Sequence, residues 1–217
     1  MTAGFDLILI GQALAALLFL GASWPSAIMS GQTRRHAALV GTMILSAVAV
    51  YDMDVINGPD IIGALIVGGG FGLLLGREWP RGRWMPLLTI FTGFSAAAML
   101  CAAAAAWLNP YAFGLVDEGS IGIAARHMLA LAVVTMGGIG ASTCALGALL
   151  GGERSAVLLL VLAIAMAGWS AAALALLLEN VGLLAAGGLS AAAGTGVALR
   201  ICGGARGKGL ADAGSHP

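Results

Sequence analysis

SAVLLLVLAIAMAGWSAAALALLL, residues 155–178, is a long apolar run without a charged side chain. About 20 mostly apolar residues are needed for a helix to cross the roughly 30 Å hydrocarbon core of a bilayer. This stretch therefore predicts a membrane-spanning helix. Working outward, six further apolar stretches are separated by glycine, proline and charged residues. The predicted spans are residues 5–22, 36–51, 61–76, 85–108, 123–150, 155–178 and 181–200.

The composition agrees with a membrane protein. Of the 217 residues, 60% are hydrophobic and only 9% are charged, whereas a soluble domain has about 25% charged residues. The formal net charge of +0 argues against a nucleic-acid partner, which requires a basic excess. Three cysteines, two of them inside apolar runs, exclude a secreted disulfide framework. We predict an all-α integral membrane protein with a bundle of seven transmembrane helices over residues 1–203 and a short polar tail over residues 204–217.

The distribution of basic residues predicts the orientation. If the chain crosses seven times, nine of the ten Lys and Arg residues fall on one side, and only Arg126 falls on the other. The positive-inside rule places that basic side in the cytoplasm, so the N-terminus is expected outside and the C-terminus inside, in a bacterial inner (cytoplasmic) membrane. The predicted cytoplasmic-side anchors are Arg34, Arg35, Arg77, Arg81 and Arg83.

The predicted spans lack deep ionisable residues, which are costly in a membrane and mark transport function when they occur. His127, next to Arg126 at a helix start, is the best candidate for protonation chemistry. An interfacial histidine that touches lipid headgroups is the favoured alternative. No histidine pair could face each other around a haem, and the single lysine, Lys208, lies beyond the last span, which excludes retinal. We therefore expect no cofactor, no metal site and no catalytic residue.

Small residues recur on several spans. Glycine at such positions lets helix backbones approach closely, so we expect these faces to pack within the bundle or against other integral membrane subunits, besides the contacts with membrane lipids. A dinucleotide-binding loop is excluded in the third span because no strand precedes its glycines. The predicted helix-packing residues are Gly68, Gly69, Gly70, Gly72, Gly138, Gly168, Trp169, Gly187 and Gly194.

Several segments occur in an order that is typical of one family. They are the polar turn 30–41 with its arginine pair, the glycine-rich third span, Met85–Pro86, Gly168–Trp169, Leu178, Asn180 and residues 187–202. In this order the chain resembles the membrane domain of the β subunit of the proton-translocating NAD(P) transhydrogenase. The resemblance covers most of the chain and implies a helix bundle that works beside transhydrogenase α and NADP-binding chains.

The departures from the family bear on function. The resemblance aligns the family's proton-path histidine with Thr92, its asparagine before the Gly-Trp pair with Ile164, and an acidic residue with His127. Two spans between the fifth and sixth helices are missing, and a short tail stands where the NADP(H)-binding domain would follow. The deep polar groups on which proton passage relies are therefore replaced.

Three functions remain open. The favoured one is a non-catalytic accessory membrane subunit that packs against other membrane helices in a larger complex, and we expect no NADP(H) binding or hydride transfer by the isolated chain. The alternative is the proton-translocating part of a split transhydrogenase, with His127 and Thr92 as proton-path candidates. A small transporter or channel is disfavoured because the sequence has no inverted repeat or broken helix.

Overall fold

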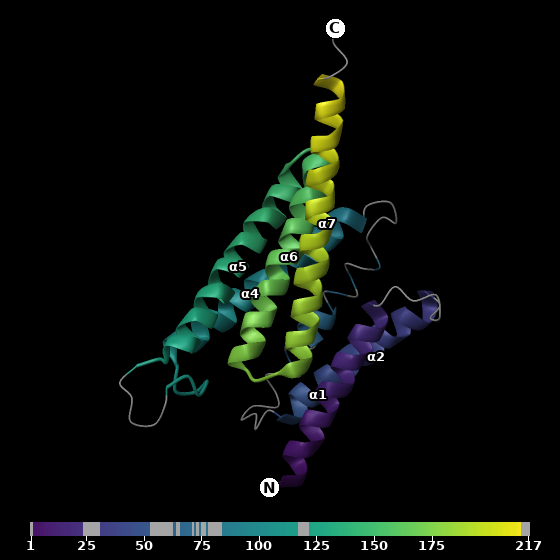
Figure 1. Cartoon of the computed structure of the whole chain (residues 1–217). Helices are drawn as coiled ribbons and strands as arrows, with labels where there is room; N and C mark the ends of the chain where they lie inside the picture. The colour runs from purple at the N-terminus through teal and green to yellow at the C-terminus, as the bar shows by residue number, and fades with distance from the viewer. Residues whose placement is uncertain are drawn as a thin grey trace.

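The computed structural model describes residues 2–23, 31–52, 63, 66–70, 72, 74, 77, 84–116 and 122–213. The described part is helical, with turns and short irregular segments and no strand. Only single residues and one short helical stretch of the third predicted span are included. The helices are α1 (Thr2–Ser23), α2 (Gly31–Asp52), α4 (Trp84–Leu108), α5 (Ala125–Leu150), α6 (Glu153–Leu177) and α7 (Val181–Ala213), labelled in Figure 1.

Four described helices are long and apolar enough to cross a membrane. They are α4, α5, residues Ser155–Leu177 of α6 and residues Val181–Gly203 of α7. A helix of 25 residues, such as α4, is about 37 Å long at 1.5 Å per residue, which exceeds the hydrocarbon thickness of about 30 Å. A shorter apolar helix, Leu7–Ala22, lies within α1. The chain is therefore a multi-pass membrane protein, while the number of spans and their orientation stay predictions.

The helix bounds follow the apolar runs closely. The α4, α5 and α6 helices begin and end within two residues of the predicted spans. The α7 helix begins at Val181 as predicted but continues to Ala213, through residues 204–213 that we expected as a polar tail. No proline interrupts this segment, so no residue removes a backbone donor or clashes with the preceding turn.

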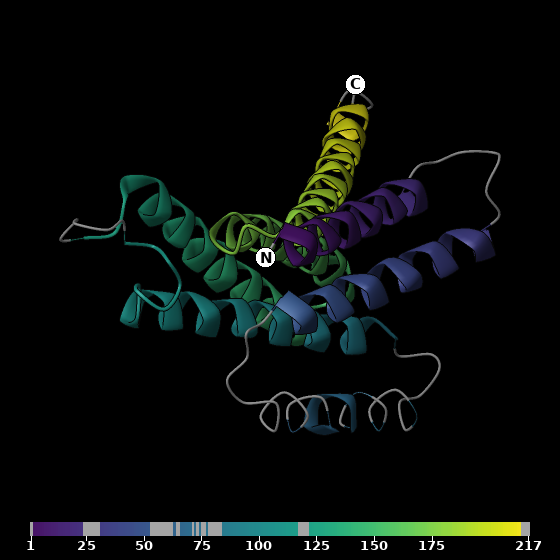
Figure 2. The ribbon, with the colours of Figure 1, turned by 90° about the horizontal axis from the view of Figure 1, so that it is seen from below.

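The helices pack in two groups that meet at α7. In the first group α5 packs against α4 and α6, α6 also contacts α4, and α7 packs along α6. In the second group α1 pairs with α2, and α1 also contacts α7. Figures 1 and 2 show the α1–α2 pair lying to one side of the larger group, with the C-terminal end of α7 projecting beyond it.

The interior is built mainly from alanine. Ala96, Ala141, Ala163 and Ala191 are completely buried, while large apolar side chains such as Leu150, which is 87% exposed, cover the outside. In water, exposed leucine side chains would be unfavourable. In a membrane they contact lipid tails that are equally apolar, so burying them gains no hydrophobic free energy. Small side chains inside allow the backbones to lie close together.

Candidate functional site

The seam between α6 and α7 is a direct contact of two backbones. A Cβ added to Gly194 would lie 2.8 Å from the amide nitrogen of Ala165. A Cβ on Gly187 would lie 2.9 Å from the carbonyl oxygen of Gly168, and a Cβ on Gly168 would collide with the backbone of Ala191. Ordinary contacts of a Cβ begin at about 3.4 Å. The structure thus brings three of the predicted packing glycines into one seam that has no room for a side chain.

Two adjacent glycines of α5 face different neighbours. A Cβ on Gly138 would lie 2.8 Å from the Leu100 side chain of α4. A Cβ on Gly137 would instead lie 3.0 Å from the carbonyl oxygen of Met166 in α6. Successive residues of a helix point about 100° apart. This pair of glycines therefore lets α5 pack closely against α4 and α6 at the same level along its axis.

The structure shows no close packing contact for the remaining glycine candidates among the described residues. A Cβ on Gly68, Gly69, Gly70 or Gly72 meets no atom within 4 Å. Trp169, next to Gly168 in α6, is 56% exposed. Whether these residues pack against another chain stays a prediction.

The anchor candidates are only partly covered by the structure. Arg34 and Arg35 lie in the first two turns of α2, and Arg77 is an exposed helical residue. Arg81 and Arg83 lie outside the described residues. Among the residues that are described, no group of three His, Cys, Asp or Glu side chains could hold a metal ion.

Two buried polar side chains join helices, and no pattern in the sequence predicted the partner of the first, Ser170. The Ser170 hydroxyl, which is fully buried, donates a 2.8 Å hydrogen bond to the carbonyl oxygen of Val134 in α5. The Gln12 carboxamide of α1, which is 4% exposed, accepts a hydrogen bond from the amide of Val181. The first amides of a helix have no partner within it, so Gln12 helps to satisfy the start of α7. Such bonds between helices contribute about 0.6 kcal/mol on average in membranes.

His127 is held from both sides. The Arg126 Nε–H donates to His127 Nε2 at 3.2 Å, and His127 Nδ1 lies 3.1 Å from the carbonyl oxygen of Leu115. Because Nε2 accepts a hydrogen bond, the proton of a neutral ring must be on Nδ1, which then donates to Leu115. His127 therefore links the start of α5 to the preceding connection through a hydrogen bond.

Leu115, whose carbonyl oxygen lies beside His127, fills space in the bundle core. Leu115 is 1% exposed although it lies in the α4–α5 connection. It belongs to a buried cluster with residues of α4, α5 and α6, including Ala106, Leu131 and Leu177. Its amide donates to the carbonyl oxygen of Pro110 at 2.9 Å. The sequence carried no periodic signal for this residue, since the connection is too short and irregular.

Two of the three positions that the resemblance aligns with polar groups of the family line one cavity, and the third, His127, does not. Thr92 and Ile164 both line a space of about 320 Å³ between α4, α6 and α7. The Thr92 hydroxyl donates to the carbonyl oxygen of Leu88 at 2.8 Å. The other two hydroxyls, those of Ser95 and Ser190, also donate to carbonyls of their own helices. None of the described residues that line this cavity carries a titratable side chain.

Comparisons of the chain with protein-family models, with curated protein sequences and with solved structures found no match.

Proposed function

We propose that the chain is a non-catalytic accessory subunit of a larger membrane complex, built like a shortened membrane domain of the transhydrogenase β subunit and located in a bacterial inner membrane. In this proposal seven spans place the N-terminus outside and the C-terminus in the cytoplasm. The four candidate spans support a packing role because Asp, Glu and Lys are missing from them, and their only Arg and His residues are Arg126, His127 and Arg200, near the ends. Ionisable residues at depth are what proton and ion pathways use.

The observation that carries the proposal is the chemistry of the Thr92 cavity. A proton relay needs side chains that both take up and release a proton at depth. Here the two aligned positions that line the cavity offer a hydrocarbon side chain, Ile164, and a hydroxyl that donates to the carbonyl oxygen of Leu88. The hydroxyl oxygens of the cavity can accept hydrogen bonds, but no described residue of its lining would carry a charge.

The geometry of His127 supports the same conclusion. Both ring nitrogens are engaged, one by Arg126 and the other by the carbonyl oxygen of Leu115. A proton-conducting histidine would need a partner along the span, whereas these contacts fix the α4–α5 connection. We therefore assign His127 a structural role in the proposed subunit.

The experiment is purification of the tagged chain from its native membrane in a mild detergent, with identification of the accompanying chains and a proton-uptake assay of the complex in vesicles. We expect other integral membrane subunits in fixed ratio, and the same proton uptake with the wild-type chain and with His127→Ala or Thr92→Val. Recovery of transhydrogenase α and NADP-binding chains, with uptake that Thr92→Val or His127→Ala abolishes, would establish the split transhydrogenase instead. A chain that purifies alone and fully folded would also overturn the accessory role.

A further inference from the structure

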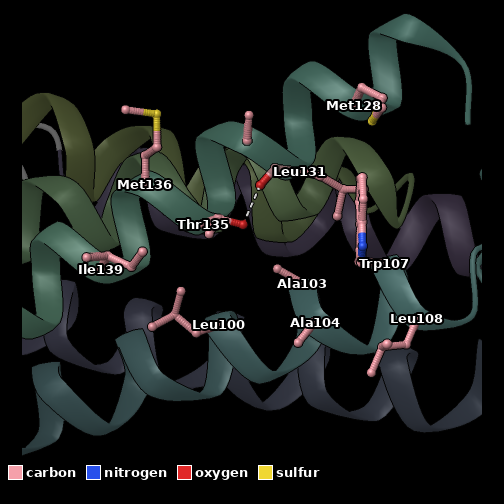
Figure 3. A pocket seen from close by; sticks show the side chains of 11 residues that line it. Leu100, Ala103, Ala104, Trp107, Leu108, Met128, Leu131, Thr135, Met136 and Ile139 are labelled. Atoms are coloured by element: carbon pink, nitrogen blue, oxygen red, sulfur yellow. Dashed lines mark hydrogen bonds between the residues drawn. The ribbon is translucent and has the colours of Figure 1, made fainter.

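A groove of about 840 Å³ lies between α4 and α5. Its walls are mainly apolar, with Leu100 and Ala104 on α4 and Ala132 and Met136 on α5. The polar groups of its described lining are the indole N–H of Trp107 at one end and the hydroxyl of Thr135, which donates to the carbonyl oxygen of Leu131 at 2.8 Å (Figure 3). The groove therefore offers no polar group that seeks a ligand along its length, and its chemistry fits a hydrocarbon chain.

The groove extends over about half of a membrane span. At one end the two helices touch, because Leu100 fills the space beside Gly138. At the other end the groove reaches Met128, near the start of α5. From Met128 to Ile139 the α5 wall rises about 16 Å at 1.5 Å per residue, close to half of the roughly 30 Å hydrocarbon core. This length fits one acyl chain of one leaflet.

The open end has the character of a membrane–water interface. Trp107 stands there between the two helices, as Figure 3 shows. It is 55% exposed, and no hydrogen bond joins its indole N–H to another described residue. Tryptophan is enriched where one end of the ring meets lipid and its N–H meets polar groups. The first turn of α5 lies beside this end, and the positive end of the helix dipole there favours negative charge.

We propose that this groove binds one acyl chain of a bilayer phospholipid, taken from the leaflet next to the α4–α5 connection. The ester and phosphate groups of the lipid lie beside Trp107 and the first turn of α5. A helix of another chain, which is about 10–12 Å wide, would also have to pass Leu100 and cover the second hollow between α4 and α5, which Gly93, Ala97 and Leu146 line; the test below separates this occupant from a lipid. The proposal concerns α4 and α5 alone and goes beyond the proposed function.

The test compares two substitutions at neighbouring exposed alanines of α4. Ala104 lines the groove and Ala105 does not. The full chain and both variants are reconstituted in vesicles of palmitoyl-oleoyl phosphatidylcholine, extracted in dodecyl maltoside and washed, and the bound phospholipid is measured by native mass spectrometry. We expect the wild-type chain and Ala105→Phe to retain the phospholipid, and Ala104→Phe to lose it because the ring fills the groove.

A second position guards against a folding defect of that variant. Ala132→Leu narrows the same groove from the α5 side and should also lower the retained phospholipid, with the helix content checked by circular dichroism. Equal retention in the wild type and all three variants, or no retention by the wild type, would overturn the proposal. So would a loss of oligomeric mass in Ala104→Phe without loss of lipid, since the occupant would then be a second copy of the chain.

Discussion

Replacing Gly187 by alanine should open the seam between α6 and α7, whereas the same change at Gly188 should not. A Cβ on Gly187 would lie 2.5 Å from the amide nitrogen of Ala172 and 2.9 Å from the carbonyl oxygen of Gly168. Both atoms belong to the backbone, so neither can rotate away. The helices would have to separate by about half an ångström or more, a gap that forfeits a quarter to a half of the dispersion energy at each contact.

The neighbouring position is a matched control. A Cβ on Gly188 meets no atom within 4 Å, and the residue lies in the same turn of α7. Both substitutions gain about 1 kcal/mol of helix propensity, and this gain cancels in the comparison. Overpacking costs about 1–3 kcal/mol, so the free energy of unfolding of Gly187→Ala should be about 2 kcal/mol below that of Gly188→Ala.

The measurement is thermal unfolding of the two purified variants in dodecyl maltoside, followed by circular dichroism. A difference of about 2 kcal/mol corresponds to a lower Tm by about 4–8 °C in a chain of this size. The wild-type chain should melt between the two variants or close to Gly188→Ala. Equal melting temperatures for the two variants would refute the assignment of this seam as a backbone contact.

Three further substitutions test other contacts. Ser170→Ala removes the hydrogen bond to Val134 and should lower the free energy of unfolding by about 0.6 kcal/mol, as measured by denaturation in mixed micelles; a loss well above 2 kcal/mol would point to an additional role. Leu115→Ala should cost about 2–5 kcal/mol because it leaves a cavity in the core, and an unchanged Tm would show that the connection does not plug the bundle. Glu179 adopts a left-handed conformation with φ of 51° at the end of α6, so Glu179→Gly should raise the stability by about 1 kcal/mol, and a lower Tm would contradict this strain.

Four of the seven predicted spans correspond to helices long and apolar enough to cross a membrane, because long apolar runs are a strong signal. The contacts of single residues were not predictable. The run 155–178 predicted α6 to within two residues at each end. In contrast, Gly69 and Gly194 were both predicted to pack, yet a Cβ on Gly194 would meet the backbone of Ala165 whereas a Cβ on Gly69 meets no atom within 4 Å. A helix that is apolar all round carries no periodic pattern that fixes its rotation, so the sequence could not tell which glycine would face the seam.

In the candidate site, too, the positions of residues along the helices could be predicted but their contacts could not. The position of His127 at a helix start was predicted, but its partner is a carbonyl oxygen twelve residues earlier in the chain, which depends on how the connection folds back. Ser170 was unremarked because a serine among alanines has no spacing that predicts a partner. The proximity of Thr92 and Ile164 on one cavity required α4 and α6 to be placed side by side.

The alanine interior has a consequence for the way this protein tolerates mutation. In a water-soluble domain the most damaging substitutions remove atoms from the core. Here the buried side chains of Ala96, Ala141 and Ala191 are single methyl groups, so a substitution can remove very little. Harm comes from added atoms, so side-chain volume, rather than polarity, decides the outcome at these positions. A serine, with its small hydroxyl able to donate to a carbonyl of its own helix, should be accepted where a valine is not. Selection should therefore limit the side-chain volume at the buried positions, while the lipid-facing leucines can be replaced by other apolar residues.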